Sequence, residues 1–269
     1  MALRFLKDRL LVASTLACLC GSASALTIDG NLSDWGIDPS TWVPASGIHY
    51  VIEDQTGNGG YYLNPGWGGQ AYDAEALYAT IIGSKLYIAL ATGHNPATLQ
   101  NPAANSYGAG DFAIDFGKNG LYDVGINIVH NGTNGNADPL QTSGGIYKNP
   151  VWNYGLWNAS GAYAPGNPDP AHPTYMSSGT QIGTATIATG HATGYGSKSS
   201  DLHYFYEMSL DLSLLWAAGW DGNPFNIHWT ENCANDSIVV DPPFHVPEPS
   251  SLALLGITLL GLRSLRRRS

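Results

Sequence analysis

The chain has 269 residues, a formal net charge of −10 and 12% charged residues. Its Lys and Arg residues gather at the two ends, so residues 26–245 hold only four Lys, no Arg and 19 Asp or Glu. A surface this acidic repels phosphate backbones, which excludes nucleic-acid binding, but it is compatible with divalent cations and neutral glycans. A stretch of about 220 residues buries enough surface for one substantial core, so we expect a single domain there.

Residues 1–25 are typical of a secretory signal peptide. Three basic residues lie among the first nine, and the apolar run 10–20 is about half as long as a membrane-spanning helix requires. Ala23 and Ala25 supply the small side chains that signal peptidase accepts, so we expect the mature chain to begin at Leu26. The alternatives for this segment are a buried helix of the folded domain and a lipoprotein signal.

Residues 246–269 have three parts in order. Pro247-Glu248-Pro249 comes first, and the uncharged apolar run 250–262 follows it. The third part is a cluster of four arginines, Arg263, Arg266, Arg267 and Arg268. At about 1.5 Å per residue, the 13-residue run is shorter than a hydrocarbon core of about 30 Å. We therefore expect a short transmembrane helix that anchors the chain transiently in the inner membrane, with the arginines in the cytoplasm.

This order of Pro-Glu-Pro, short apolar helix and arginine cluster resembles the PEP-CTERM sorting signal. The resemblance implies recognition by an exosortase, cleavage near Pro247-Glu248-Pro249, and a Gram-negative host that makes exopolysaccharide. It also implies that the processed protein reaches the cell surface or the extracellular matrix. An ordinary C-terminal membrane anchor is the alternative interpretation.

Residues 26–245 are predicted to be all-β, as a single antiparallel β-sandwich of the jelly-roll type with long loops. Residues 76–82 and 85–91 read as a hairpin across the two-residue turn Gly83-Ser84. The remaining predicted strands are 49–53, 112–116, 121–129, 146–148, 202–210, 225–230 and 237–240. Residues 212–217 are the one predicted helix of this body, and the stretches 56–70 and 131–196 are predicted to be rich in loops, where binding sites usually lie.

The start of the predicted mature chain carries a second resemblance. Residues 26–35, LTIDGNLSDW, are similar to the opening of family 9 carbohydrate-binding modules and their DOMON-like relatives. The resemblance implies a β-sandwich with Trp35 packed on it. No sugar-binding residue of that family is carried over, because its sugar-clamping tryptophans have no aligned position here.

Catalytic signatures are missing from the sequence, which has no nucleophile elbow, HExxH helix, phosphate loop or paired-cysteine zinc pattern. Cys233 is the only cysteine after the predicted processing, and we expect it to be buried. A non-catalytic protein is therefore expected. The alternative is a secreted glycosidase-like enzyme with two carboxylates in an aromatic cleft. The carboxylates considered for that role are Glu53, Asp73, Glu75, Glu207 and Glu231.

A calcium site is the better chemical prediction. Asp111 and Asp115 are four residues apart on one predicted strand and share a face, and Asp73 and Glu75 form a second such pair before the hairpin. Carboxylates on one face repel each other unless water, a cationic side chain or a metal ion intervenes. Since the body holds only four Lys, Ca²⁺ with oxygen ligands is the candidate cofactor, and solvated carboxylates are the alternative.

Loop aromatics give a prediction of glycan binding. Trp67, Trp152, Tyr154 and Trp157 lie in segments rich in Gly and Asn that cannot easily cover large rings. An exposed indole stacks on a sugar ring while its N–H forms a hydrogen bond, so an exopolysaccharide or another surface glycan is the expected partner. The alternative is that these rings fold back onto the sheet. Three further tryptophans sit in apolar patterns and are expected in the core: Trp35, Trp216 and Trp229.

Overall fold

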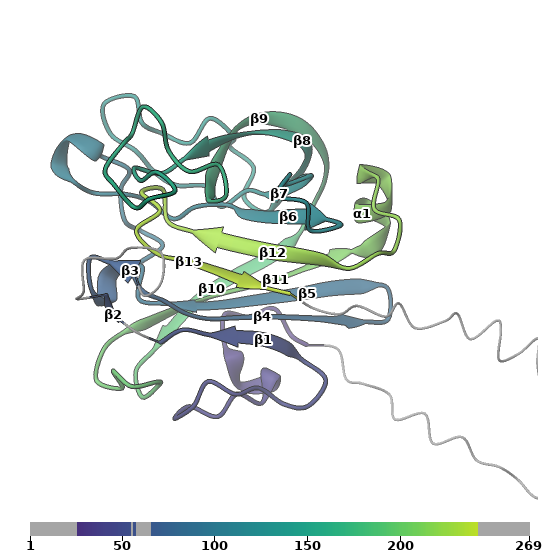
Figure 1. The fold of residues 1–269 in the computed structure, drawn as a ribbon. Helices are drawn as coiled ribbons and strands as arrows, with labels where there is room; N and C mark the ends of the chain where they lie inside the picture. The colour runs from purple at the N-terminus through teal and green to yellow at the C-terminus, as the bar shows by residue number, and fades with distance from the viewer. Residues whose placement is uncertain (1–25, 55, 58–65, 242–269) are drawn as a thin grey trace, which may run out of the picture.

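The computed structural model describes residues 26–54, 56–57 and 66–241, which form two antiparallel sheets stacked face to face (Figure 1). The predicted signal peptide, its cleavage site at Ala23 and Ala25, and the sorting segment lie outside the described residues. The five-stranded sheet has the order β1 (His49–Ile52), β4 (Ala74–Ile82), β5 (Lys85–Thr92), β11 (His203–Asp211) and β10 (Thr186–Ala192). The prediction of an all-β sandwich is confirmed.

The six-stranded sheet packs on the first sheet. Its order is β13 (Ser237–Val240), β12 (Phe225–Thr230), β6 (Phe112–Phe116), β7 (Val124–Ile126), β8 (Gly145–Tyr154) and β9 (Pro173–Thr184). The smaller elements are the parallel pair β2 (Thr56–Gly57) and β3 (Gly66–Trp67), the helix α1 (Leu212–Ala218), and the 3-10 turns η1 (Leu32–Trp35), η2 (Gln70–Tyr72) and η3 (Pro102–Ala104). Across the described ranges, no helix is both long and apolar enough to cross a membrane.

The predicted hairpin is confirmed, with Ile82 and Lys85 paired on either side of the turn. Gly83 adopts a φ of +62° there, a conformation that glycine reaches without strain. The alternation in β5 places Leu86, Ile88 and Leu90 in the core between the sheets, while its other face is buried as well. Burial of both faces makes β4 and β5 the centre of the molecule.

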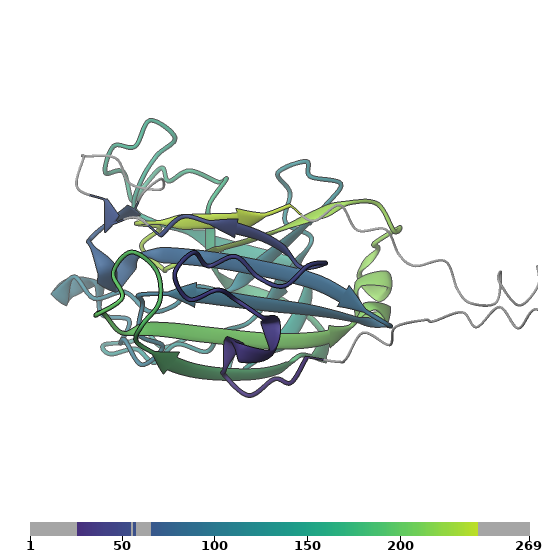
Figure 2. The ribbon, with the colours of Figure 1, turned by 90° about the horizontal axis from the view of Figure 1, so that it is seen from below.

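A second core covers the outer face of the five-stranded sheet. Its members include Trp35, Trp42, Tyr78 and Phe205, and the segment that precedes β1 supplies the two tryptophans. Figure 2 shows this N-terminal segment lying across the strands. The expected burial of Trp35 is therefore confirmed, as is that of Trp229, which lies between the sheets with no exposed surface.

One predicted core residue is not in the core. Trp216 lies on α1 with 46% of its surface exposed, and its ring packs on Trp220 with the centroids 4.6 Å apart. The helix turns Leu212 and Leu215 inward, and Trp220, which follows the helix, is the buried tryptophan. The prediction for Trp216 was wrong because a seven-residue helix buries only one narrow face.

The prediction of a loop-rich stretch over 131–196 is wrong for β9, β10 and most of β8, since only the part of β8 at 146–148 was predicted as a strand. β9 and β10 are the outermost strands of their sheets, and the middle of β9 is exposed. Strands at a sheet edge that face solvent carry Ser, Thr and Gly rather than alternating apolar residues, so the sequence lacks the period-two signal.

One carboxylate fastens the N-terminal segment to β11. Glu207 is fully buried and accepts the backbone N–H groups of Asp29 (3.1 Å), Gly30 (2.6 Å) and Asn31 (3.0 Å), and the indole N–H of Trp35 (2.7 Å). Gly30 has a φ of +84°, and a Cβ there would lie 2.6 Å from the backbone of β10. We call this arrangement the N-terminal clip. It gives the Asp-Gly-Asn and Trp of the opening motif a structural role.

Candidate functional site

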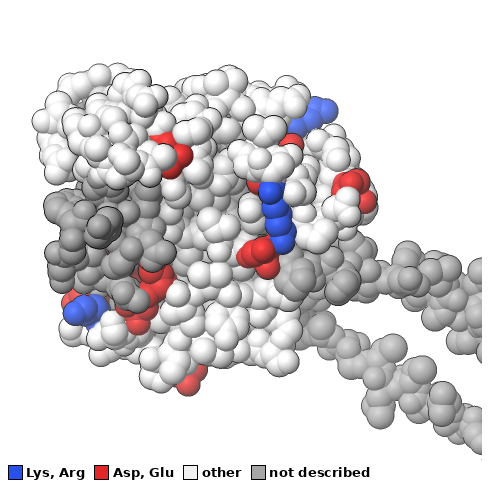
Figure 3. Space-filling view, viewed as in Figure 1, with Lys and Arg blue, Asp and Glu red and all other residues white. Residues whose placement is uncertain are grey.

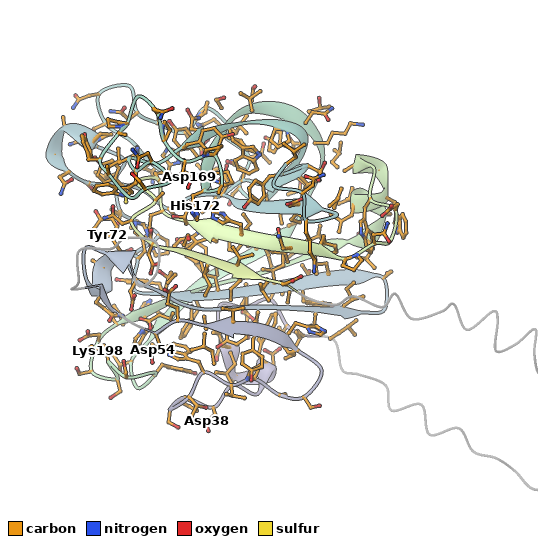
Figure 4. The ribbon with its side chains drawn as sticks, in the orientation of Figure 1. Asp38, Asp54, Tyr72, Asp169, His172 and Lys198 are labelled. Carbon is orange, nitrogen blue, oxygen red and sulfur yellow. The ribbon has the colours of Figure 1, made fainter. Side chains whose placement is uncertain are left out.

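Four carboxylates meet at one end of the sandwich, and we call them the carboxylate cluster. Glu53 directly follows β1, Asp73 directly precedes β4, and Glu231 and Asp236 lie at the two ends of the loop that joins β12 to β13. The fold brings these segments together, because the backbone N–H of Ala74 donates to Asp236 Oδ2 at 2.8 Å. Figure 4 labels the neighbouring Asp54 and Tyr72 at this end of the molecule.

The cluster is buried and its members perturb one another. Asp73, Glu231 and Asp236 expose 1% of their surface or less, and Glu53 is half-buried. Burial, reinforced by the other carboxylates, raises the pKa of Asp73 to about 9. Burial and a hydrogen bond shared with Asp236 raise the pKa of Glu53 to about 8, and burial raises the pKa of Glu231 well above its usual range. The cluster must therefore be neutralised by protons or by a cation.

A buried ion pair lies beside the cluster. Glu75 Oε1 is 2.9 Å from His203 Nδ1, and the same oxygen accepts a hydrogen bond from the side-chain amide of Gln70. Burial lowers the pKa of His203, but the hydrogen bond and charge of Glu75 outweigh it and raise the pKa overall. The His203 ring also packs edge-on against Trp42, with the centroids 5.3 Å apart. These contacts hold Glu75 in place, whereas Asp73 has none.

A cavity of about 630 Å³ opens on the other side of Gln70. It is bounded by η2, by the segment after β5 and by the start of β11. The side chains that its chemistry depends on are Gln70, Tyr72, Asn95, Thr98, Asp201 and Tyr204. Gln70 therefore connects the cavity with the Glu75–His203 ion pair, since it lines the cavity and its amide contacts Glu75.

Two smaller cavities lie elsewhere. One, of about 250 Å³, lies between Asn136 and Tyr175, and another, of about 260 Å³, lies between Ile128 and Tyr206. A glycosidase needs two carboxylates on either side of the scissile bond. None of these three cavities is lined by such a pair, because Asp201 is the only carboxylate among their lining residues. The paired-carboxylate cleft of the enzyme alternative therefore has no counterpart in them.

The predicted calcium ligands fall in two separate places. Asp73 and Glu75 lie at the carboxylate cluster and interact electrostatically. Asp111 instead accepts the backbone N–H groups of Ile128 (2.7 Å) and Met176 (2.8 Å). Asp115 accepts two backbone N–H groups of the turn after β6, at 3.1 and 2.7 Å. Backbone donors thus satisfy Asp111 and Asp115, which need no shared cation to stay buried.

The structure offers no preformed coordination shell. Among the described residues, no group of three or more His, Cys, Asp or Glu side chains is arranged so that it could hold a metal ion. Binding of a cation would therefore require side chains to turn. Cys233 is buried, as predicted.

The predicted glycan-binding aromatics are only partly available. Trp152 is half-buried and donates its indole N–H to the backbone oxygen of Tyr122 at 3.3 Å. Trp157 is half-buried as well and donates to Asn235 Oδ1 at 3.1 Å. Tyr154 is 37% exposed. Both indole N–H groups are thus used within the protein, and glycan binding by this group stays a prediction.

Two other aromatic residues are Trp67, which was predicted to bind glycan, and Tyr163, which was not. The backbone of Trp67 lies in β3, but its side chain is outside the described residues. Tyr163 is 66% exposed and packs edge-on against Trp157 at 5.6 Å. Tyr163 lies in the segment ASGAYAPG, which holds no tryptophan that would single it out in the sequence.

Two residues of the site, Asp236 and His203, were not identified from the sequence, and Glu231 was considered only as a carboxylate of the enzyme alternative. Glu231 and Asp236 lie in the short loop ENCAND, and His203 begins β11. Each of them, like Glu53 and Asp73, lies at or next to the end of a strand. Polar residues at strand ends were the available signal, but it does not say which ends meet in space.

Comparison with known families identifies the C-terminal segment. The model of the PEP-CTERM protein-sorting motif matches residues 245–268, which include Pro247-Glu248-Pro249 and the arginines Arg266, Arg267 and Arg268. No curated protein matches the chain. The resemblance of residues 26–35 to family 9 carbohydrate-binding modules has no such support and stays a prediction. The chain carries a PEP-CTERM protein-sorting motif, the signal of exported proteins that an exosortase processes at the membrane.

Proposed function

We propose that this protein is displayed at the surface, or in the extracellular matrix, of a Gram-negative bacterium as a non-catalytic, glycan-binding module. On this proposal signal peptidase removes residues 1–25 and an exosortase removes residues 246–269 after transient anchoring in the inner membrane. The sorting motif supports the route of export. The observation that supports glycan binding is the composition of the cavity beside Gln70.

The cavity combines the two kinds of group that a sugar ring requires. Tyr72 and Tyr204 supply flat apolar faces, while Gln70, Asn95 and Thr98 supply amide and hydroxyl groups for hydrogen bonds to sugar hydroxyls. A volume of about 630 Å³ lies within the range of small-molecule sites, about 300–1,000 Å³. One or two sugar units of a longer chain would fit such a space.

Charge favours a neutral glycan over an anionic one. The cavity is lined by one carboxylate, Asp201, and by no Lys, Arg or His. The space-filling view shows a largely uncharged face with few basic side chains (Figure 3). Since residues 26–245 carry only four Lys, an acidic polysaccharide would meet repulsion without compensation. Binding at a single site should be weak, and attachment to a polymer would depend on many displayed copies.

Titration of the purified protein with the neutral exopolysaccharide of its producer, followed by intrinsic fluorescence, tests this proposal. We expect Tyr72→Ala and Tyr204→Ala to weaken binding roughly tenfold, a difference of about 1.4 kcal/mol. Tyr163→Ala, an exposed tyrosine outside the cavity, serves as the matched control. Loss of binding in Trp152→Ala or Trp157→Ala instead would mean that the glycan binds at the aromatic residues in and after β8 rather than in the cavity.

Two outcomes would reject the proposal. The first is binding of neither neutral nor acidic polysaccharide by the wild-type protein. The second is release of reducing ends from the polysaccharide, which would favour the glycosidase-like alternative. Chromatography of the polysaccharide after long incubation distinguishes a binder from an enzyme.

A further inference from the structure

The carboxylate cluster contains polar groups that the protein itself leaves unpaired. Both carboxylate oxygens of Asp73 are buried without a hydrogen-bond partner, and so are both oxygens of Glu231 and Oε1 of Glu53. The Tyr206 hydroxyl is fully buried without a partner as well, and burial together with the charge of Glu231 raises its pKa. Native structures rarely leave such groups unsatisfied, because each costs about 1–3 kcal/mol and more when charged.

The ion pairs of the described ranges supply no positive charge to Asp73 or Glu231. These pairs involve Lys85, Lys118, His130 and His203. None of them includes Asp73 or Glu231, and His203 is already engaged by Glu75. Asp73 and Glu231 therefore lie at a site that several segments build, without an ion pair to a cationic side chain of the described residues.

We propose that the carboxylate cluster binds one divalent cation of the Ca²⁺ type, with Asp73 and Glu231 as its principal ligands. Hard oxygen donors from four carboxylates match the ligand set that Ca²⁺ prefers. The inference is independent of the glycan proposal, because the cluster and the cavity share no residue.

The ligands must turn to reach the ion, since no preformed coordination shell exists among the described residues. Asp236 is fixed by the backbone N–H groups of Ala74 and Ser237, both at 2.8 Å. Asp73 gives up no side-chain hydrogen bond when it rotates, since neither of its carboxylate oxygens has a partner. A site that forms by rotation rather than in advance should be weak, in the range of extracellular calcium modules, with a Kd of about 10⁻⁴ to 10⁻³ M.

The position of the site suggests what the cation does. It would join the end of β1, the start of β4 and the loop between β12 and β13, and so link the edges of both sheets. A cation that binds only the folded state raises its stability in proportion to the logarithm of its concentration. Export places the protein where millimolar Ca²⁺ is common, so the proposed role is structural.

Thermal unfolding of the chelator-stripped protein, with Ca²⁺ or Mg²⁺ added, tests the inference. We expect the midpoint to rise by roughly 3–10 °C at about 10 mM Ca²⁺ and by much less with Mg²⁺, which needs a more rigid shell. Asp73→Asn and Glu231→Gln should each abolish the rise while the protein stays folded in EDTA, because a neutral amide has nearly the shape of the protonated carboxyl group that it replaces. Asp211→Asn, an exposed aspartate on β11, is the matched control and should keep the full response.

Calorimetric titration with CaCl₂ supplies a second measurement that does not depend on the variants folding. Saturable binding of one Ca²⁺ per chain is the expected result. No binding by wild type, or an undiminished response in both Asp73→Asn and Glu231→Gln, would overturn the inference. If one variant fails to fold, the other and the wild-type titration still decide it.

Discussion

Buried carboxylates occur in two regions of the molecule, and the two regions differ in how many hydrogen bonds the carboxylates accept. In the N-terminal clip, Glu207 has no exposed surface and accepts four hydrogen bonds of 2.6–3.1 Å. In the carboxylate cluster, Asp73 is buried to the same degree and accepts none. Burial raises the pKa of both groups, and for Glu207 the hydrogen bonds from Trp35 and the backbone offset part of that rise.

This difference separates a structural carboxylate from a candidate ligand-binding one. A carboxylate that is surrounded by donors holds chain segments together and has no free oxygen for a ligand. A carboxylate without donors is destabilising until a proton or a cation joins it. Burial alone is therefore a poor indicator of function in this fold, and the number of donors is the useful quantity.

The largest expected effect is the loss of the N-terminal clip. Glu207→Ala leaves three backbone N–H groups and the indole N–H of Trp35 without their acceptor, next to a new cavity. We expect a loss of about 3–5 kcal/mol in the free energy of unfolding. Urea unfolding followed by tryptophan fluorescence measures it, since Trp35 and Trp42 lie in the affected core.

The isosteric Glu207→Gln is the matched control for that change. Its amide oxygen still accepts from some of the donors, while its NH₂ group opposes the others, so an intermediate loss of about 1–2 kcal/mol is expected. Equal stability of Glu207→Ala and wild type would mean that the N-terminal clip does not stabilise the fold. Hydrogen-bonded and unpaired buried carboxylates would then not differ in their effect on stability.

A smaller effect is expected from pH at the carboxylate cluster. The pKa of Asp73 is about 9 and that of Glu53 about 8 in the folded protein, against ordinary values of 3.8 and 4.5. Between pH 7 and 9 both groups are ionised in the unfolded chain, whereas the folded state retains their protons. The free energy of unfolding therefore falls as the pH rises, by at most about 1.4 kcal/mol per pH unit for each proton. The contribution of these two groups to stability is fully present below their ordinary pKa values and is lost as the pH rises through about 8 and 9.

Urea midpoints at pH 7, 8 and 9 in EDTA measure this slope. Asp73→Asn should flatten it, because one titrating group is removed. The window also avoids His94 and His130, whose pKa values burial lowers to about 4 and which are neutral throughout it. A stability that rises with pH, or identical slopes in both proteins, would contradict the account of the cluster.

Sequence patterns predicted the fold well where apolar residues alternate. The hairpin of β4 and β5, the strands β6, β12 and β13 and the helix α1 lie within two residues of their predicted bounds. The pattern fails for β9 and β10, whose exposed edge positions carry polar residues on both faces. Tertiary pairing, rather than local preference, makes those strands.

The candidate site was predicted less completely, for a physical reason. Asp73 and Glu75 were selected because they are close in sequence, and that reasoning also selected Asp111 and Asp115, which backbone N–H groups satisfy. Two of the partners that complete the cluster, Glu231 and Asp236, lie about 160 positions away, and Ala74 N and Asp236 Oδ2 are separated by 162 residues. Spacing along the chain carries no information about donors that come from such distant segments.

The smallest effect is expected at a third kind of carboxylate, one that is exposed. Asp211 on β11 pairs with Lys85 on β5 at 3.1 Å, and 55% and 42% of the two side chains are exposed. Water solvates both charges with or without the partner, so Lys85→Ala should change the free energy of unfolding by no more than about 0.5 kcal/mol, and less at high salt. Urea unfolding at low and high ionic strength measures it, with Lys148→Ala as a control that lacks this pair. A loss above about 1.5 kcal/mol would mean that this exposed ion pair stabilises the fold more than solvated charges should, and that exposed and buried carboxylates differ less than we propose.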